Sequence, residues 1–346
     1  MKRILFANNY DMAKSRESYL HGNSPSHHQF GTNELIETGE FEVDYILVAP
    51  ANHDSKVMKL LSLFPIWFNL YQKAKKYDIV YGAADFTVDF LGILKKFRLF
   101  KPTLIGIFHH PPFPLRLKVE HFDHILFLSH YAHEEMSEIF PRKAVQMKFM
   151  QWGPDLPFYQ KWAPIQNFKK KQEKTVFISN GKTRRDHELL VKVAKATANH
   201  TIIVCDKQSM PDQYDEVNSY IEIFLQDRPD DTKMVQLLNR CSVLVIPLPP
   251  TPQRLGPIGL TSLVDAIALG MPVITADNSV FADIVEKNKL GLVYKAGDAT
   301  SLAQAMNLFK EHPELIANYG KNAWEFGKQN DISSFGKQLY QLLKEK

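Results

Sequence analysis

The sequence is poor in several features that would assign it to a special class of protein. It contains only two cysteines, Cys205 and Cys241, which excludes a disulfide framework and predicts two buried thiols. No stretch reaches the ~18 consecutive apolar residues that a membrane-spanning helix requires. The chain has no internal repeat, no low-complexity tract and no long run of like charges. Its net charge of +4 is too small to indicate nucleic acid as a partner.

The remaining composition is that of an ordinary globular protein, with 45% hydrophobic and 23% charged residues. Because single cores stop growing near ~250–300 residues, a chain of 346 residues predicts two domains. Short apolar runs alternate with helical patterns, which predicts an α/β architecture. The first strand is expected at 3–7, rather than a signal peptide, and an irregular polar loop then runs to about Ser26. We expect a cytoplasmic protein.

The most informative stretch is 247–275, PLPPTPQRLGPIGLTSLVDAIALGMPVIT. An apolar strand ends at its first residue, and a loop rich in proline and glycine follows. A short helix is expected over 260–269, before the next strand begins. In a βαβ unit of this kind, phosphates bind at the loop and the helix N-terminus.

Several residues of this stretch are candidate ligand contacts. Gly259 would let the backbone approach a ligand closely, and the amides near Leu260 and Thr261 would meet phosphate oxygens. Asp265 lies one helical turn further on, where it could reach a ribose hydroxyl. The alternative is a plain strand–helix loop with a capped helix.

The block GLTSLVDAIALGMPVITA resembles the donor-site signature of retaining glycosyltransferases of family 4, which have the GT-B fold. In that family two glutamates are separated by seven residues, and Asp265 stands where the second one holds the ribose. The first glutamate, which contacts the donor sugar, is missing, and Pro257 lies at that distance. The resemblance implies two Rossmann-like domains facing across a cleft, a C-terminal helix that returns to the first domain, and a nucleotide-sugar donor.

A second candidate phosphate contact is the loop after the strand expected at 175–179. It carries Lys182, Arg184 and Arg185 just before a helix expected at 187–197. Arginine forks match phosphate oxygens, and the helix dipole adds to their attraction. The resembling family neutralises the donor pyrophosphate with a basic pair at this loop, and Lys182 and Arg185 match that pair best. The alternative is a solvated basic turn.

Histidines gather in the first half of the chain. The strand expected at 102–108 runs straight into His109 and His110, which places imidazoles at the carboxyl edge of a parallel sheet. In the resembling family a histidine here faces the donor sugar and diphosphate, and we assign this catalytic role to His109. His27 and His28, like His110, are candidates for an acceptor or donor loop, and all three could equally be loop residues without a function.

No metal or other cofactor is expected. The pairs His121-x-x-His124 and His130-x-x-His133 have no nearby cysteine or consistent carboxylate partner for zinc. The chain also has no Asp-x-Asp pair, which argues against the other large glycosyltransferase fold and its divalent ion. We expect the UDP- or GDP-linked sugar donor to bind as a substrate, with cationic side chains neutralising its diphosphate.

Two segments combine aromatic residues with lysines: 57–76 and 94–101. Pro65 interrupts the first, which predicts two helical pieces. Such stretches suit a peripheral contact with the inner face of the cell membrane, and that contact would imply a lipid-linked or membrane-proximal acceptor. The alternative is a pair of core-facing helices whose lysines reach outward.

These observations predict an acceptor-binding domain at 1–157, a nucleotide-sugar-binding domain at 158–330 and a returning helix at 331–346. The expected function is that of a retaining hexosyltransferase, acting on a glycan or lipid-linked acceptor in surface polysaccharide or glycoconjugate synthesis. Two alternatives stay open. One is a non-catalytic glycosyltransferase-like partner subunit, which the missing glutamate favours, and the other is a nucleotide-sugar epimerase of related fold.

Overall fold

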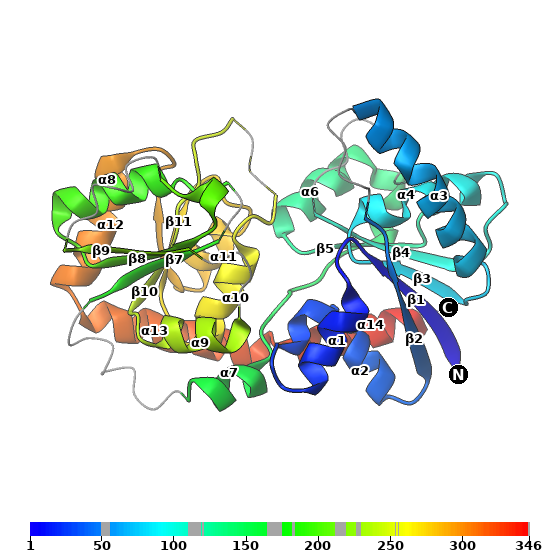
Figure 1. Cartoon of the computed structure of the whole chain (residues 1–346), viewed down its shortest axis with the longest axis horizontal. Coiled ribbons are helices and arrows are strands. Elements are labelled where there is room, and N and C mark those ends of the chain that lie inside the picture. The colour runs from blue at the N-terminus through cyan, green and yellow to red at the C-terminus, as the bar shows by residue number, and fades with distance from the viewer. Residues whose placement is uncertain are drawn as a thin grey trace. The chain divides into compact units, whose positions relative to one another are not determined.

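The chain divides into two compact units, which we describe separately. The computed structural model describes residues 1–49, 56–109, 119, 121–164, 175–181, 184–211, 219–225, 230–252, 254 and 256–344, with the side chains of 56–61 excepted. Unit 1 contains Met1–Gly22, Ser26–Trp152 and Ile332–Lys346. Unit 2 contains Asn23–Pro25 and Gly153–Asp331. Figure 1 colours the chain from blue to red along this path.

Unit 1 is built on a parallel sheet of six strands in the order β2-β1-β3-β4-β5-β6. The strands are β1 (Lys2–Asn8), β2 (Phe41–Leu47), β3 (Ile79–Gly82), β4 (Thr103–Phe108), β5 (His124–Phe127) and β6 (Met147–Phe149). From β1 the chain goes to β2 on one side and then returns past β1 to β3 on the other. The strand order therefore reverses between β1 and β3, which is where such sheets bind ligands.

The helices of unit 1 pack on this sheet. They are α1 (Met12–Leu20), a 3₁₀ turn (Ser26–Gln29), α2 (Thr32–Glu37), α3 (Lys56–Ala74), α4 (Asp85–Lys96), α6 (His130–Ile139), a second 3₁₀ turn (Pro141–Gln146) and α14 (Ile332–Lys344). The prediction of two helical pieces around Pro65 is wrong, because α3 is one helix with this proline inside it. Its packing compensates for the missing hydrogen bond: Leu70 is fully buried, and the Trp67 ring stacks on Phe90 of α4 at 5.2 Å.

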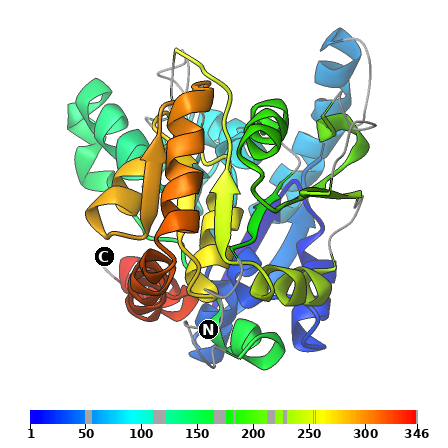
Figure 2. The same ribbon diagram turned by 90° about the vertical axis from the view of Figure 1, so that its left-hand side faces the viewer.

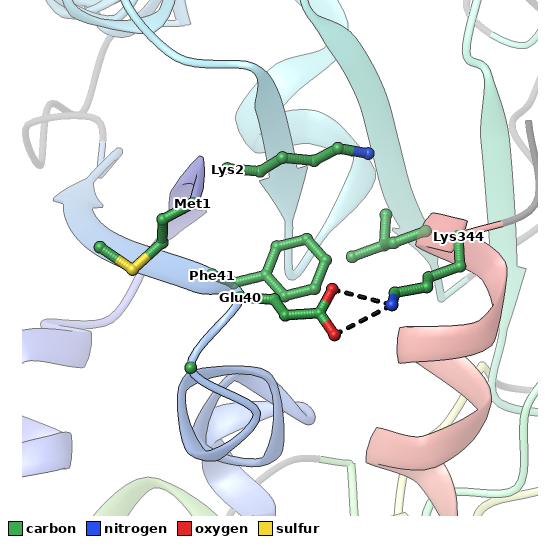
Figure 3. Close-up of a pocket in the computed structure, with 7 residues that line it drawn as sticks. Met1, Lys2, Glu40, Phe41 and Lys344 are labelled. Atoms are coloured by element: carbon green, nitrogen blue, oxygen red, sulfur yellow. Dashed lines mark hydrogen bonds and ion pairs between the residues drawn. The ribbon is translucent and has the colours of Figure 1, made fainter.

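The expected return of the C-terminal helix to the first unit is confirmed. Helix α14 lies beside α2 (Figure 1), and the Gly31 backbone is close enough that a Cβ there would be 3.1 Å from the Phe335 ring and 3.2 Å from Leu339. Near the C-terminal end of α14, Tyr340 Oη and Lys344 Nζ donate hydrogen bonds to the Glu40 carboxylate, at 2.6 Å and 2.9 Å. Figure 3 shows this ion pair at an open pocket of about 380 Å³. The pocket lies at the amino ends of β1 and β2, opposite the edge where ligands bind.

Unit 2 also has six parallel strands, in the order β12-β11-β10-β7-β8-β9. The strands are β7 (Phe177–Asn180), β8 (Thr201–Cys205), β9 (Ile221–Leu225), β10 (Val243–Ile246), β11 (Val273–Ala276) and β12 (Gly291–Tyr294). Read along the chain, this is the 3-2-1-4-5-6 order of a dinucleotide-binding Rossmann fold, with its switch point between β7 and β10. Cys205 and Cys241 are both buried thiols, as predicted.

Helices cover both faces of the second sheet, as Figure 2 shows in green, yellow and orange. They are α7 (Leu156–Trp162), α8 (His187–Thr197), a 3₁₀ turn (Lys207–Ser209), α9 (Asp231–Asn239), α10 (Leu260–Ala268), α11 (Ala282–Lys287), α12 (Ala299–Glu311) and α13 (Glu314–Gln329). Helix α8 packs with α12, and α10 packs with α13. In the described part of the chain no helix is both long and apolar enough to cross a membrane.

Candidate functional site

The candidate site lies at the switch point of unit 2, where the loops that follow β7 and β10 leave the same edge of the sheet. The two loops are directly connected, because the Asp186 backbone N–H donates to the Pro247 carbonyl at 3.0 Å. Asp186 also caps α8, where its side chain accepts from the Leu189 N–H at 3.0 Å. The end of the basic turn is thus fixed to the end of β10 and to the start of α8.

Arg185 joins this turn to the first helical turn of α10. Its Nη2 donates to Ser262 Oγ at 3.2 Å, and Ser262 Oγ donates in turn to the Asn180 carbonyl at 2.9 Å. The guanidinium also lies against Gly181, where a Cβ would be 2.6 Å from Nη2. Only a glycine leaves this space. The two segments that the sequence predicts as phosphate contacts therefore meet through Arg185.

The charge of Arg185 is partly removed from water. Burial lowers the pKa of its guanidinium to about 10, so it stays cationic at neutral pH. A cation in such surroundings attracts an anion more strongly than one in bulk water. Arg184, its neighbour, is exposed. Lys182 lies outside the described residues.

The N-terminus of α10 begins at Gly259, which adopts a left-handed conformation (φ +93°) that favours glycine. A side chain here would also meet Ile246, whose Cγ2 lies 2.6 Å from the Cβ position. Gly259, the N-cap residue, has no side chain to cap the helix, and the Leu260 N–H donates to the Pro257 carbonyl at 3.0 Å. Thr261 is exposed in the first turn.

Asp265 lies in the second turn of α10 with only 8% of its surface exposed. Asn180 Nδ2 donates to Asp265 Oδ2 at 3.0 Å, and the Tyr159 hydroxyl donates to Oδ1. Burial raises the pKa of the Asp265 carboxyl to about 6, against these two hydrogen bonds. Sequence reasoning did not find Tyr159 as a member of the site.

A further carboxyl group belongs to this neighbourhood. Burial and the nearby charge of Asp265 raise the pKa of Asp231, at the start of α9, to about 7. Burial also raises the pKa of the Tyr159 hydroxyl well above its ordinary value, so it remains a donor. The site thus has a cationic side, at Arg185, and a buried acidic side.

The histidines predicted as site residues lie in unit 1. His109 follows β4, and its Nε2–H donates to the Ala83 carbonyl at 2.8 Å, in the loop after β3. It therefore reaches the switch point of the first sheet. His110 lies outside the described residues.

His27 and His28 belong to a 3₁₀ turn that packs on Trp152. Their ring centroids are 4.3 Å apart, and Trp152 Nε1 donates to the His27 carbonyl at 2.9 Å. Burial lowers the pKa of His27 well below its ordinary value and that of His28 to about 4. Both rings are therefore neutral at neutral pH. Within the described ranges, no group of three or more histidine, cysteine, aspartate or glutamate side chains is arranged to hold a metal ion.

Comparison with known proteins bears on this site. The family described as "Glycosyl transferases group 1" matches residues 158–326, the part of the chain that carries both loops and α10. This region is therefore similar to the group 1 glycosyltransferases. A search of curated protein sequences gave no match.

Solved structures match over both units. HepE of Anabaena, in complex with UDP-glucose, aligns with a TM-score of 0.68 at 16% identity over 100% of both chains. Sucrose-phosphate synthase from Thermosynechococcus elongatus aligns with a TM-score of 0.71 at 15% identity over 100% of this chain and 99% of that one. A Listeria monocytogenes protein assigned as a UDP-N-acetylglucosamine 2-epimerase aligns with a TM-score of 0.63 at 12% identity, over 99% and 96%. These likenesses confirm the GT-B fold with its two Rossmann-like domains.

Proposed function

We propose that this protein is a retaining glycosyltransferase that moves a hexose from a nucleotide-diphospho-sugar to a glycan or lipid-linked acceptor, in surface polysaccharide or glycoconjugate synthesis. The observation that carries the proposal is the junction of Arg185 with α10 at the switch point of the group 1 domain. It sets a cation and a helix N-terminus beside a buried carboxylate, which suits a diphosphate next to a ribose. The UDP-glucose complex of HepE supports a UDP-linked donor.

In this proposal the residues of unit 2 bind the donor and stabilise its leaving group. As the bond between the sugar and the diphosphate breaks, negative charge grows on the diphosphate, and Arg185 with Lys182 would meet it. Preorganised charge of this kind is usually the largest contribution to catalysis. His109 of unit 1 would orient the sugar. The proposal includes no metal ion, because cationic side chains supply the charge.

Calorimetry with UDP, GDP and ADP tests the binding step, and release of nucleoside diphosphate from a panel of nucleotide sugars tests turnover. We expect one nucleotide to bind clearly more tightly than the others and one of its sugars to turn over when acceptor is present. A protein that binds none of the three would contradict the proposal.

Two other functions remain candidates, each for a specific reason. Pro257 stands where a family 4 enzyme has its sugar-binding glutamate, which favours a non-catalytic partner subunit. The Listeria protein supports an epimerase on the same fold. The same panel separates them: tight nucleotide binding without any turnover indicates the partner subunit, and interconversion of sugar epimers without transfer indicates the epimerase.

We also propose that unit 1 contacts an anionic membrane through an exposed apolar patch, which we define as Phe64, Phe68, Phe97 and Leu99. These side chains are 57%, 65%, 63% and 60% exposed. The first two lie on α3 and the others follow α4 (Figure 1), and Tyr71 Oη of α3 donates to the Leu99 carbonyl at 3.4 Å. The two segments that the sequence pairs by composition are therefore neighbours within one unit.

Exposed cations lie on the same two segments as the exposed apolar patch. They are Lys75, Lys76, Lys96, Arg98 and Lys101. Apolar side chains that can insert, together with cations for anionic headgroups, are what an interfacial contact requires. Each cation near such a surface contributes about 1 kcal/mol. Lys56 and Lys59 have no described side chains and carry no part of the argument.

Flotation on liposomes tests this contact. We expect the protein to float with phosphatidylglycerol-containing vesicles at low salt, and the double variant Phe64→Ser/Phe68→Ser to stay in solution. Phe224→Ser is the matched control, because Phe224 is a 44% exposed phenylalanine on β9 of unit 2. A wild-type protein that stays in solution with these vesicles would rule out the contact.

A further inference from the structure

The carboxylate of Asp265 is held by donors from two other elements of unit 2. Asn180, the last residue of β7, donates to Oδ2 at 3.0 Å, and Tyr159 of α7 donates to Oδ1. Among the described residues these are its two hydrogen-bond donors. Each carboxylate oxygen can accept two hydrogen bonds, so each oxygen keeps one acceptor position. Two adjacent hydroxyl groups could occupy these positions together.

Tyr159 reaches Asp265 from outside the strand–helix units that form the switch point. It belongs to α7, a helix of seven residues that follows the start of unit 2 at Gly153. Asp155 fixes the start of α7, because its Oδ1 accepts from the Phe158 N–H at 3.2 Å. Tyr159 itself is 2% exposed, so its hydroxyl has no solvent alternative to the carboxylate. Loss of that contact would leave a buried carboxylate with a single donor.

The ionisation of Asp265 depends on these donors. Burial raises the pKa of this carboxyl, and the hydrogen bonds from Tyr159 and Asn180 both act against the rise, because they stabilise the charged form. Asp231 of α9 is another ionisable side chain near Asp265, and Arg185 contacts the same helix through Ser262. A protonated Asp265 would use one oxygen as a donor and lose the symmetric pair of acceptors that a diol needs.

We propose that Tyr159 is a positioning residue for the donor's ribose. It keeps the Asp265 carboxylate ionised and oriented, so that the two remaining acceptor positions receive the hydroxyls of the ribose diol. The inference rests on the proposed function, because it requires a nucleotide at this site. Tyr159 would not touch the nucleotide, and its effect would pass through Asp265.

The test measures the ratio of affinities for UDP and 2′-deoxy-UDP by calorimetry, between about pH 5 and about pH 8. Both ligands carry the same ionisable diphosphate, so the ratio reports on the 2′-hydroxyl contact alone. The GDP and ADP pairs are measured in parallel, since the base is not fixed. In the wild-type protein we expect the ratio to rise with pH as Asp265 ionises, with a midpoint near pH 6.

In Tyr159→Phe we expect this midpoint to move to higher pH and the ratio near the wild-type midpoint to fall about tenfold, because a charge-assisted hydrogen bond is lost. Asn180→Ala should move the midpoint in the same direction. This variant replaces Tyr159→Phe in the test if Tyr159→Phe does not fold. Tyr294→Phe is the matched control. It removes the hydroxyl of another buried tyrosine of unit 2, which accepts from the Leu248 N–H at 3.3 Å, and it should leave the midpoint unchanged.

The outcomes separate this inference from the proposed function. A wild-type protein that prefers the ribose nucleotide, together with unchanged midpoints in Tyr159→Phe and Asn180→Ala, would overturn the inference and leave the function standing. A wild-type protein that binds none of the nucleoside diphosphates would overturn both. A loss of stability in Tyr159→Phe with an unshifted midpoint would assign the residue a structural role only.

Discussion

The two units share one kind of sheet, yet their switch points differ in chemistry. In unit 2, Arg185, Ser262, Asn180 and Asp265 form a continuous chain of hydrogen bonds across the carboxyl edge. In unit 1, His109 reaches the corresponding edge by donating to the Ala83 carbonyl, and two further histidines, His27 and His28, are neutral imidazoles packed on Trp152. Unit 2 holds a fixed charge at its switch point, whereas the rings of His27 and His28 in unit 1 are uncharged.

In the proposed reaction, this difference predicts different roles for the two sheets. A diphosphate requires charge that is already in place, and Arg185 is held by its hydrogen bond to Ser262 and lies against Gly181. A sugar is uncharged and is recognised by hydrogen bonds and by contact with rings. We therefore expect changes in unit 2 to act on nucleotide binding and on the leaving group, and changes in unit 1 to act on the transfer step.

The largest effect is expected for Arg185→Ala. Loss of its guanidinium should lower turnover by about 10³-fold and weaken nucleotide binding as well, because the cation acts on both the bound and the departing diphosphate. Lys192→Ala is the control, since it removes an exposed cation from the same helix, α8. Steady-state kinetics and calorimetry check both variants. Equal turnover in the two variants would refute the role of Arg185.

A smaller and more selective effect is expected for His109→Ala. If this imidazole orients the sugar, turnover should fall about tenfold to a hundredfold while the affinity for the nucleoside diphosphate stays unchanged. His21→Ala, which removes an exposed histidine of unit 1, should change neither quantity. A loss of nucleotide affinity in His109→Ala would break the division between the units, since His109 would then contribute to binding.

The sequence predicts the fold well where an apolar stripe and a cap coincide. Helices α8 and α9 begin and end at the residues expected, and Asp186 and Asp230 cap them. The segment that contains α1 was expected to be irregular, and this was wrong. Met12 is its one buried residue, so the helix has almost no apolar stripe, and the Asp11 side chain caps its start.

The site is only partly readable for a different reason. The motif around Asp265 and the basic residue Arg185 lie within two short segments, and a pattern in the sequence can identify each of them. Tyr159 lies 106 residues from its partner, Asp265, and no pattern in the sequence links these two residues. Its role depends on tertiary packing, and a single sequence carries no local signal of such a contact.

The pH dependence of stability tests whether the buried carboxyl groups of unit 2 resist ionisation. Burial and the charge of Asp265 raise the pKa of Asp231 from 3.8 to about 7, so the folded protein holds this proton more tightly than the unfolded chain. Stability should therefore fall as the pH rises from about 4 to about 7. Asp231→Asn should raise the melting temperature by about 2–4 °C at pH 8 and have little effect at pH 4.

Asp230→Ala is the matched control for this variant. The hydrogen bond from the Thr232 side chain and that from the Lys233 N–H lower the pKa of Asp230, which caps α9. Its loss should lower stability at pH 8 by about 1 kcal/mol, opposite in sign to its neighbour. A lower melting temperature for Asp231→Asn at pH 8 would show that the carboxylate is stabilised where it lies.

The smallest effect is expected at the end of α14, in unit 1. Lys344 pairs with Glu40 at 2.9 Å, but both side chains are 47% exposed, so water and salt screen the attraction (Figure 3). Lys344→Ala should therefore lower the free energy of unfolding only slightly. Leu339→Ala, on the same helix and fully buried beside Gly31, should lower it by about 2–5 kcal/mol. Denaturant unfolding of both variants shows whether burial or charge attaches α14 to the rest of unit 1. An effect of Lys344→Ala as large as that of Leu339→Ala would assign the attachment to the ion pair.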